Sequence, residues 1–185
     1  MSVNVAVIVG SLRKGAFSRS TALVLKELAA PRLDLKIVEI GDLPLYNPDL
    51  DGESPPAAWT RFRGEVAAVD AVLFVTPEYN RSITGALKNA LDVGSRPYGH
   101  SVWDAKPAAV VSVSPGLLGA FGANHHLRQS LVFLNMPVLQ QPEAYISKVG
   151  DLLDADGKLT NDSTKDFFKA FTIKFADWID RTEAK

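Results

Sequence analysis

Three short runs of almost uninterrupted apolar residues constrain the fold of this chain more than any other feature. They are VNVAVIV at 3–9, AVLFVT at 71–76 and AAVVSVS at 108–114. A strand with one face in water alternates apolar and polar residues, whereas continuous apolar runs are typical of parallel strands buried on both faces. The sequence therefore predicts a parallel sheet with helices on both sides.

Weaker strand patterns occur at 33–40 and 136–142. Helical spacing of apolar residues fills the gaps, at 18–29, 57–68, 83–91, 121–134 and 163–180. Strand and helix thus alternate five times, which predicts one doubly wound α/β domain over residues 1–185, with a five-stranded parallel sheet. Ligands of such sheets bind beyond the carboxyl ends of the strands, so the loops after the first, third and fourth strands are the candidate sites.

Composition narrows the classes of function. A net charge of −1 argues against a general binder of nucleic acid or of anionic membranes. The absence of cysteine excludes disulfides, thiolate catalysis and iron–sulfur clusters. No metal site is expected, because the adjacent His125 and His126 point in different directions on a helix. The N-terminal segment has no basic region, and its apolar run is too short for a signal or membrane span, so we expect a cytoplasmic protein.

The loop after the first strand, GSLRKGAFS at 10–18, has the chemistry of an anion site. Gly10 allows a sharp turn, Ser11 and Ser18 offer hydroxyls, and the following helix offers free backbone N–H groups. Arg13 can add a bidentate contact to a phosphate. Neither the dinucleotide pattern G-x-G-x-x-G nor the P-loop pattern is present, which favours a single mononucleotide phosphate.

The charge of this loop supports the same interpretation. Arg13, Lys14 and Arg19 lie near the positive end of a helix without an acidic residue among them. Cations at a helix N-terminus are unfavourable unless something offsets them, so an anionic ligand is expected. The alternative is an ordinary turn between strand and helix, with Ser18 as the N-cap.

The loop after the third strand opens the segment TPEYNRSITGALKNALD at 76–92. Pro77 ends the strand, and either Ser82 or Thr84 caps the next helix. A run of backbone N–H groups, with Tyr79 and Asn80 beside them, can read the polar edge of a planar heterocycle. Glu78 and Arg81 add to the density of polar side chains in this loop. The alternative is a proline turn followed by an N-cap, with no ligand.

The loop after the fourth strand, in SVSPGLLGAFGAN at 112–124, is kept slim by Gly116, Gly119 and Gly122. Such a loop can pack flat against the other face of a ring. Glycine at these positions is equally consistent with simple turn chemistry.

Together, GSLRKGAFS, TPEYNRSITGALKNALD and KPAAVVSVSPGLLGAFGA resemble the NAD(P)H-dependent FMN reductases of flavodoxin-like fold. Within that family they are most similar to bacterial quinone reductases that are also described as chromate reductases. The resemblance covers roughly residues 3–150. It implies a flavodoxin-like sheet of strand order 2-1-3-4-5.

The resemblance also implies roles for individual residues. Ser11, Arg13 and Ser18 would hold the FMN phosphate. One side of the isoalloxazine would be lined by Pro77, Glu78, Tyr79 and Asn80. The other side would be closed by Ser114 and Gly116. This sequence departs from the family pattern at Ala16, Ser18 and Ala120, where relatives often have serine, asparagine and glycine.

By the same resemblance, hydride passes from NADPH or NADH to FMN and then to a quinone, with chromate, azo compounds or free flavins as further acceptors. The flavin carries the reaction, so no catalytic side chain is expected. Arg81 is a candidate contact for the phosphates of NAD(P)H or for an anionic acceptor, and a solvated surface arginine is the alternative. Relatives form a homodimer or homotetramer, which is expected here too.

Two other functions are compatible with the same fold. A flavodoxin-type carrier would shuttle single electrons between proteins without oxidising NAD(P)H directly. Such carriers are usually strongly acidic, whereas this chain is nearly neutral. A flavin-free binding module is the third alternative, because fold alone does not fix function.

Overall fold

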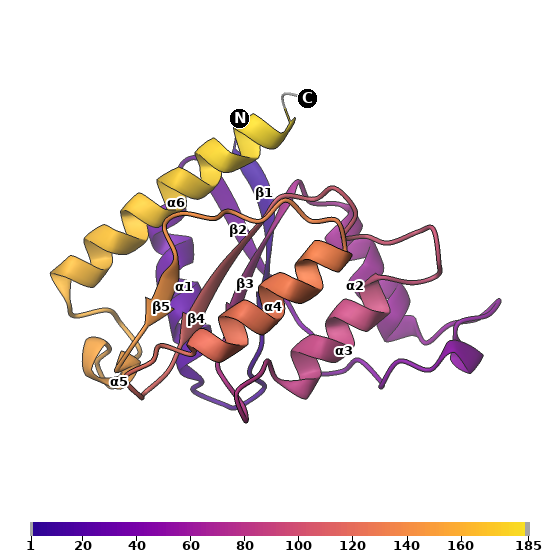
Figure 1. Cartoon of the computed structure of the whole chain (residues 1–185), viewed down its shortest axis with the longest axis horizontal. Helices are drawn as coiled ribbons and strands as arrows, with labels where there is room; N and C mark the ends of the chain where they lie inside the picture. The colour runs from indigo at the N-terminus through magenta and orange to yellow at the C-terminus, as the bar shows by residue number, and fades with distance from the viewer. Residues whose placement is uncertain (1, 184–185) are drawn as a thin grey trace.

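Five parallel strands form one sheet in the computed structural model, which describes residues 2–183 (Figure 1). They are β1 (Val3–Val9), β2 (Leu33–Val38), β3 (Ala71–Thr76), β4 (Ala108–Val113) and β5 (Ala144–Ile146). Their order is β2-β1-β3-β4-β5, which confirms the predicted flavodoxin-like sheet. Because β2 pairs with one edge of β1 and β3 with the other, the strand order reverses between β1 and β3, where α/β sheets bind ligands.

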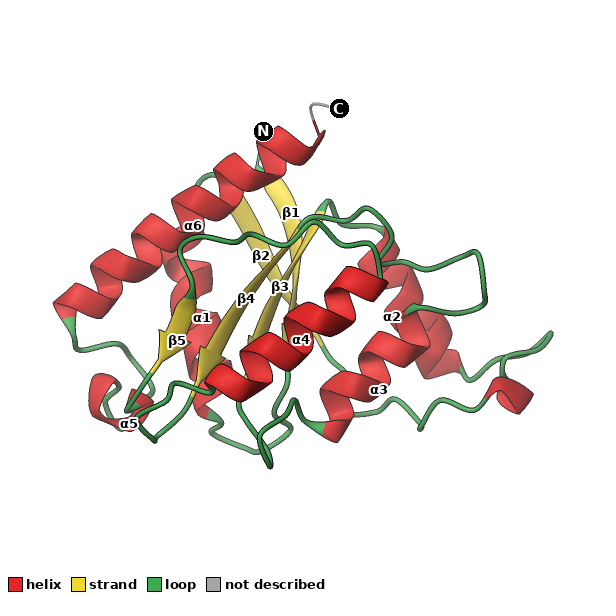
Figure 2. Cartoon of the chain, viewed as in Figure 1, coloured by secondary structure: helices red, strands yellow, loops and turns green. Residues whose placement is uncertain are grey.

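Helices cover both faces of the sheet (Figure 2). One face carries α1 (Phe17–Ala29) and α6 (Asp162–Glu183), and the other carries α2 (Ala57–Ala67), α3 (Gly85–Gly94) and α4 (Phe121–Phe133). Two short elements complete the fold, α5 (Val149–Leu152) and the 3₁₀ helix η1 (Pro48–Leu50). None of the helices in residues 2–183 combines the length and the apolar character that crossing a membrane would require.

The side chains of the central strands alternate between two apolar clusters. Val5 and Val7 of β1 pack in the cluster with α1 and α6, whereas Ala6 and Ile8 pack in the cluster with α2, α3 and α4. All four side chains are fully buried. A strand covered on both faces has no polar side to show, which explains the continuous apolar runs.

The predicted fifth strand at 136–142 is wrong. The strand is Ala144–Ile146, and the earlier segment makes only an isolated bridge between Val138 and Ala108. Pro137 and Pro142 flank this bridge, and proline has no N–H group to continue a ladder.

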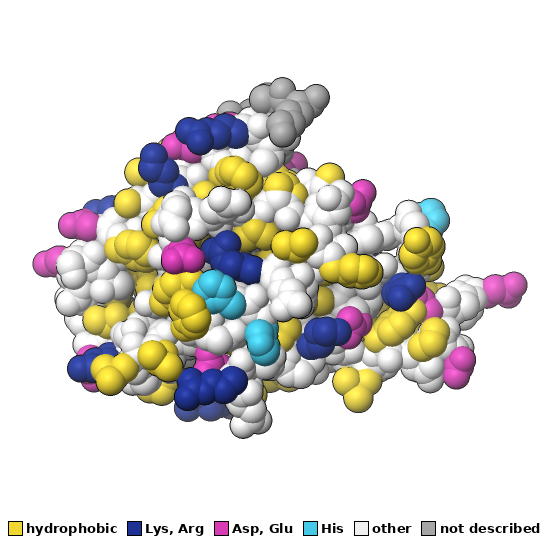
Figure 3. All heavy atoms as spheres, viewed as in Figure 1, with side chains coloured by type: hydrophobic (Ala, Val, Ile, Leu, Met, Phe, Trp, Pro, Cys, Tyr) yellow, Lys and Arg dark blue, Asp and Glu magenta, His cyan; other side chains and the backbone are white. Residues whose placement is uncertain are grey.

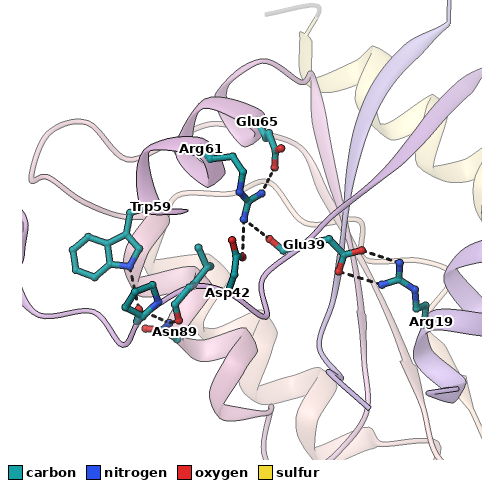
Figure 4. A network of polar contacts seen from close by, with 9 residues as sticks. Arg19, Glu39, Asp42, Trp59, Arg61, Glu65 and Asn89 are labelled. Carbon is teal, nitrogen blue, oxygen red and sulfur yellow. Dashed lines mark hydrogen bonds and ion pairs between the residues drawn. The ribbon is translucent and has the colours of Figure 1, made fainter. Parts of the chain in front are cut away.

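A network of polar contacts fixes the segment that leaves β2 (Figure 4). Arg61 of α2 donates to Asp42 over 2.9 Å. Trp59 Nε1 and Asn89 Nδ2 both donate to the carbonyl of Pro44 over 3.0 Å. These contacts keep the segment packed against α2 and α3.

Trp59 and Trp103 are fully buried in the cluster between the sheet and α2–α4. Both indole rings therefore belong to the core. Tyr98 is 90% exposed and belongs to the loop after α3.

Close packing of Trp103 makes Gly94→Ala strongly destabilising. A Cβ at Gly94 would lie 2.5 Å from Cε2 of Trp103, whose Nε1 donates to the carbonyl of Leu91. We expect the free energy of unfolding to fall by about 2 kcal/mol, because overpacking outweighs the gain in helix propensity. Thermal unfolding should show a midpoint lower by roughly 4–8 °C.

Gly64→Ala is the matched control, because it also lies in a helix but has no atom within 4 Å of the added Cβ. It should not lower the midpoint. An unchanged midpoint for Gly94→Ala would contradict the packing described.

Candidate functional site

A cavity of about 330 Å³ lies at the carboxyl ends of β1, β3 and β4. The loops that follow these strands are residues 10–16, 77–84 and 114–120, which we term the first, second and third loops. The walls of the cavity come from these loops, from the start of α1 and from the end of β4. The wall residues are Ser11, Arg13, Ala16, Phe17, Ser18, Pro77, Glu78, Tyr79, Val113, Ser114 and Pro115. The cavity therefore sits at the reversal of strand order and is large enough for part of a small ligand.

Seven residues singled out from the sequence meet in this cavity: Ser11, Arg13, Ser18, Pro77, Glu78, Tyr79 and Ser114. Asn80, Gly116 and Arg81 are outside its wall, although each is close to it along the chain. Ala16 also lines the cavity, although the sequence singled it out only as a departure from the family pattern. Sequence reasoning missed Phe17, Val113 and Pro115 as wall residues. No pattern marks these three, because their position depends on how α1 and β4 are placed.

Ser18 carries the strongest sign of a missing partner. Its Oγ is buried and has no hydrogen-bond partner within the described part of the chain. The sequence-based alternative, Ser18 as the N-cap of the helix, is wrong, because Ala16 occupies that position. A buried hydroxyl without a partner is unfavourable, and the first turn of α1 contains no acid. The start of α1 thus fits an anion whose oxygen accepts from Ser18.

Arg13 is held at the mouth of the cavity by contacts with its own loop and with the first residue of α1. Its Nη2 donates to the carbonyl of Gly15 over 3.2 Å. Its guanidinium lies 5.6 Å from the centre of the Phe17 ring. Its backbone N–H donates to Ser11 Oγ. The side chain is exposed, so a guanidinium at this position is free to contact an anion.

Arg19 corrects the sequence-based argument from charge. Its two terminal nitrogens donate to the carboxylate of Glu39 over 3.2 and 2.8 Å (Figure 4). These hydrogen bonds raise the pKa of the Arg19 guanidinium above its ordinary value. Its charge is therefore offset within the chain and does not require a ligand. Arg13 is the cation of this loop that lines the cavity.

The second loop forms a tight turn at its tip. The backbones of Tyr79 and Ser82 exchange two hydrogen bonds, over 2.9 and 3.0 Å. Asn80 and Arg81 between them have φ of 51° and 65°, the left-handed conformation of a type I′ hairpin turn. This geometry puts Tyr79 in the cavity wall and the two central residues at the tip.

Thr84 joins the first two loops. Its Oγ1 accepts from the N–H of Leu87, so Thr84 rather than Ser82 is the N-cap of α3. The same hydroxyl donates to the carbonyl of Gly10. A Cβ at Gly10 would lie 2.9 Å from Oγ1 of Thr76, so this position requires glycine. The first and second loops are thus held together by the protein itself.

A buried chain of polar side chains supports the third loop. Ser112 Oγ donates to the carbonyl of Gly119 over 2.8 Å and accepts from Asn124 Nδ2 over 3.1 Å. Arg128 Nε donates to Asn124 Oδ1, and burial lowers the pKa of Arg128. Sequence reasoning missed these residues. The polar Ser112 within an otherwise apolar run was the available signal.

The two adjacent histidines make separate contacts. His125 Nε2 lies 3.0 Å from the hydroxyl of Tyr145, and His126 Nδ1 lies 3.0 Å from Ser82 Oγ. Burial, and then the neighbouring Glu143, raises the pKa of Tyr145 to about 12. Tyr145 therefore stays protonated at neutral pH.

A larger hollow of about 680 Å³ lies between α3 and α4. Its one acidic wall residue, Asp92, already pairs with Lys88 over 2.7 Å. Basic and acidic side chains are interspersed over the face shown in Figure 3. Recognition of an anion thus depends on local groups, and those groups converge in the smaller cavity around Ser18.

Comparison with known proteins identifies the family of this chain. Residues 3–151 match the family model described as NADPH-dependent FMN reductase. A quinone reductase from Pseudomonas putida is 64% identical over 176 residues, which cover 95% of this chain and 94% of that protein. A 2-hydroxy-1,4-benzoquinone reductase from a Burkholderia species is 41% identical over 179 residues, which cover 97% of both chains. Among solved structures, the flavoenzyme NAD(P)H:(acceptor) oxidoreductase FerB from Paracoccus denitrificans aligns with a TM-score of 0.91 and 42% identity, over 97% of this chain and 98% of that one.

Proposed function

The chain belongs to the NADPH-dependent FMN reductase family, and we propose that it binds FMN in the cavity between its three loops and uses NAD(P)H to reduce a quinone. The observation that carries the placement of FMN is the buried hydroxyl of Ser18, a residue of the cavity wall, because this hydroxyl has no partner among residues 2–183. Quinones are the acceptors named for relatives that are 64% and 41% identical.

The FMN phosphate would bind at the start of α1. Ser18 would donate its hydroxyl hydrogen to a phosphate oxygen, and the first backbone N–H groups of α1 would add the positive end of the helix. Arg13, at the mouth of the cavity, would supply the neutralising charge. Ser11 would complete this contact set from the first loop.

The isoalloxazine would lie between the second and third loops. Pro77, Glu78, Tyr79 and Asn80 would line one side, and Ser114 and Gly116 the other. Ser114 Oγ already accepts from the N–H of Gly116 over 3.0 Å, which shapes this side of the site. Bound FMN supplies the hydride-transfer chemistry, so the protein needs no nucleophile or metal of its own. The task of these residues is to orient the ring and leave one face open to donor and acceptor in turn.

The remaining assignments rest on the family. We propose that chromate, azo compounds and free flavins are further acceptors, that the protein is cytoplasmic, and that it assembles as a homodimer or homotetramer. Arg81 would contact the phosphates of NAD(P)H or an anionic acceptor. Its side chain is 76% exposed and lies 3.4 Å from Glu78, so it can reach a ligand at the mouth of the site.

An absorption spectrum of the purified protein, followed by anaerobic addition of NADPH and then NADH, tests the proposal. We expect a flavin spectrum that either nucleotide bleaches rapidly and that a quinone restores. A flavin spectrum that neither nucleotide bleaches would favour a single-electron carrier. A protein that gains no flavin spectrum on incubation with FMN would contradict the proposed cofactor site.

A further inference from the structure

Helix α4 begins without a cap of its own. Ala120 occupies the N-cap position with φ of 61° and has no side chain that could accept a hydrogen bond. The first turn of α4 contains no acidic residue. The N–H groups of a first turn need acceptors from elsewhere, and the helix dipole favours negative charge there.

Glu78 of the second loop provides that acceptor. Its Oε2 accepts from the N–H of Ala123 over 3.0 Å, and its side chain is only 14% exposed. Gly122 makes room for this contact. A Cβ at Gly122 would lie 3.0 Å from Oε2 of Glu78 and 3.0 Å from the carbonyl oxygen of Arg81. The second loop and the start of α4 therefore pack closely at Gly122, where any larger residue would crowd the contact.

This contact joins the two walls proposed for the flavin ring. The third loop leads directly into α4, so a residue that holds the start of α4 also holds the end of that loop (Figure 1). Glu78 itself belongs to the opposite wall of the cavity. The distance between the two walls therefore depends on the hydrogen bond between the Glu78 carboxylate and the N–H of Ala123. These two residues lie 45 positions apart in the sequence.

We propose that Glu78 is a positioning residue, which sets the spacing of the second and third loops by capping α4 and so prepares the site before FMN binds. This inference rests on the proposed function for its ligand. Its physical basis is preorganisation, because loops that are already fixed lose less conformational freedom when a ligand binds. Gly122 is the complementary requirement, since it lets the carboxylate approach.

Titration of the apoprotein with FMN, followed by quenching of flavin fluorescence, tests this role. Glu78→Ala should raise the Kd for FMN about 10-fold, the effect of losing an ordinary helix cap. Glu78→Gln keeps an acceptor oxygen and should remain within about 3-fold of the unmodified protein. Gly122→Ala should resemble Glu78→Ala, and the double variant should bind no more weakly than the poorer single one, because both act on one contact.

Gly64→Ala is the matched control for Gly122→Ala, since it brings the same helix-favouring methyl group into open space. It should leave the Kd for FMN unchanged. Hydrogen exchange of the apoprotein gives a readout without any ligand. Residues 120–125 should exchange faster in Glu78→Ala than in Glu78→Gln, while β1 and β3 keep their protection.

An unchanged Kd for Glu78→Ala would overturn the inference, and so would equal losses for the alanine and glutamine variants. If the unmodified protein fails to bind FMN, the proposed function fails instead. In that case the exchange measurement still decides whether Glu78 holds the start of α4.

Discussion

Replacing Arg13 with alanine is expected to weaken FMN binding about 30-fold. A hydrogen bond to a charged group contributes roughly 1.5–3 kcal/mol, and each 1.4 kcal/mol corresponds to a factor of 10 in Kd. Arg13 lines the cavity and donates to Gly15 within its own loop, so little of the fold depends on it. Fluorescence titration of the apoprotein should therefore show the loss in affinity, while its thermal midpoint stays the same.

Arg19→Ala is the matched control for this experiment. Arg19 lies in the same part of the chain and carries the same charge, but its guanidinium is paired with Glu39. Exposed pairs of this kind contribute about 0–1 kcal/mol to stability. We expect the Kd for FMN to stay within about 3-fold of the unmodified protein. Equal losses for the two variants would mean that general positive charge, and not Arg13, binds the phosphate.

Asp51→Asn is expected to lower the free energy of unfolding by about 2 kcal/mol at neutral pH, because it leaves a largely buried guanidinium without its counter-charge. Both terminal nitrogens of Arg63 donate to the Asp51 carboxylate over 2.8 Å. The two side chains are 12% and 6% exposed, and Arg63 Nε also donates to the carbonyl of Val93. The pair fastens the segment after β2 to α2 and α3. Urea unfolding of both proteins at pH 7 measures the difference.

The pH dependence of this difference has a defined sign. Hydrogen bonds from Arg63 lower the pKa of Asp51 below its ordinary value of 3.8. A carboxyl group with a lowered pKa stabilises the folded state above its ordinary pKa, and that contribution is lost as the pH falls through the lowered value. The difference between Asp51→Asn and the unmodified protein should therefore be constant from pH 7 to about 5 and shrink in acid.

Asp42→Asn provides the comparison for Asp51→Asn. Asp42 also binds an arginine, Arg61, over 2.9 Å, but its side chain is 57% exposed. The cost should be at most about 0.5 kcal/mol. If the two variants lose the same free energy of unfolding, burial of the Asp51–Arg63 pair does not explain the cost of Asp51→Asn.

Most of the fold could be predicted because it follows from local patterns. The strands at 3–9 and 71–76 match β1 and β3 to the residue. Strands of a sheet that is buried on both faces are nearly continuous apolar runs, so they can be recognised from the sequence. The edge strand β5 has only three residues. An apolar pattern of three residues is too short to distinguish a strand from the isolated bridge at Val138 nearby. Its position depends on pairing with β4, which a local pattern does not contain.

The candidate site could be located from the sequence, but its electrostatics could not. The loops were found because strand ends and glycines mark them. The acid that offsets Arg19 is Glu39, which lies 20 residues away along the chain and comes close only when β2 pairs with β1. The same limit applies to Glu78, whose partner N–H belongs to Ala123. Pairing across such distances is a property of the folded chain.

The left-handed tip of the second loop restricts which variants a mutational library at Asn80 and Arg81 would retain. Glycine adopts this conformation freely, asparagine tolerates it, and β-branched residues are the least tolerant. An arginine at φ of 65° is thus not the residue that the backbone alone would select. A screen that scored only folding would enrich glycine at Arg81, whereas a screen that scored turnover would retain arginine if its side chain serves the ligand. The divergence between the two screens would separate backbone preference from function at a single position.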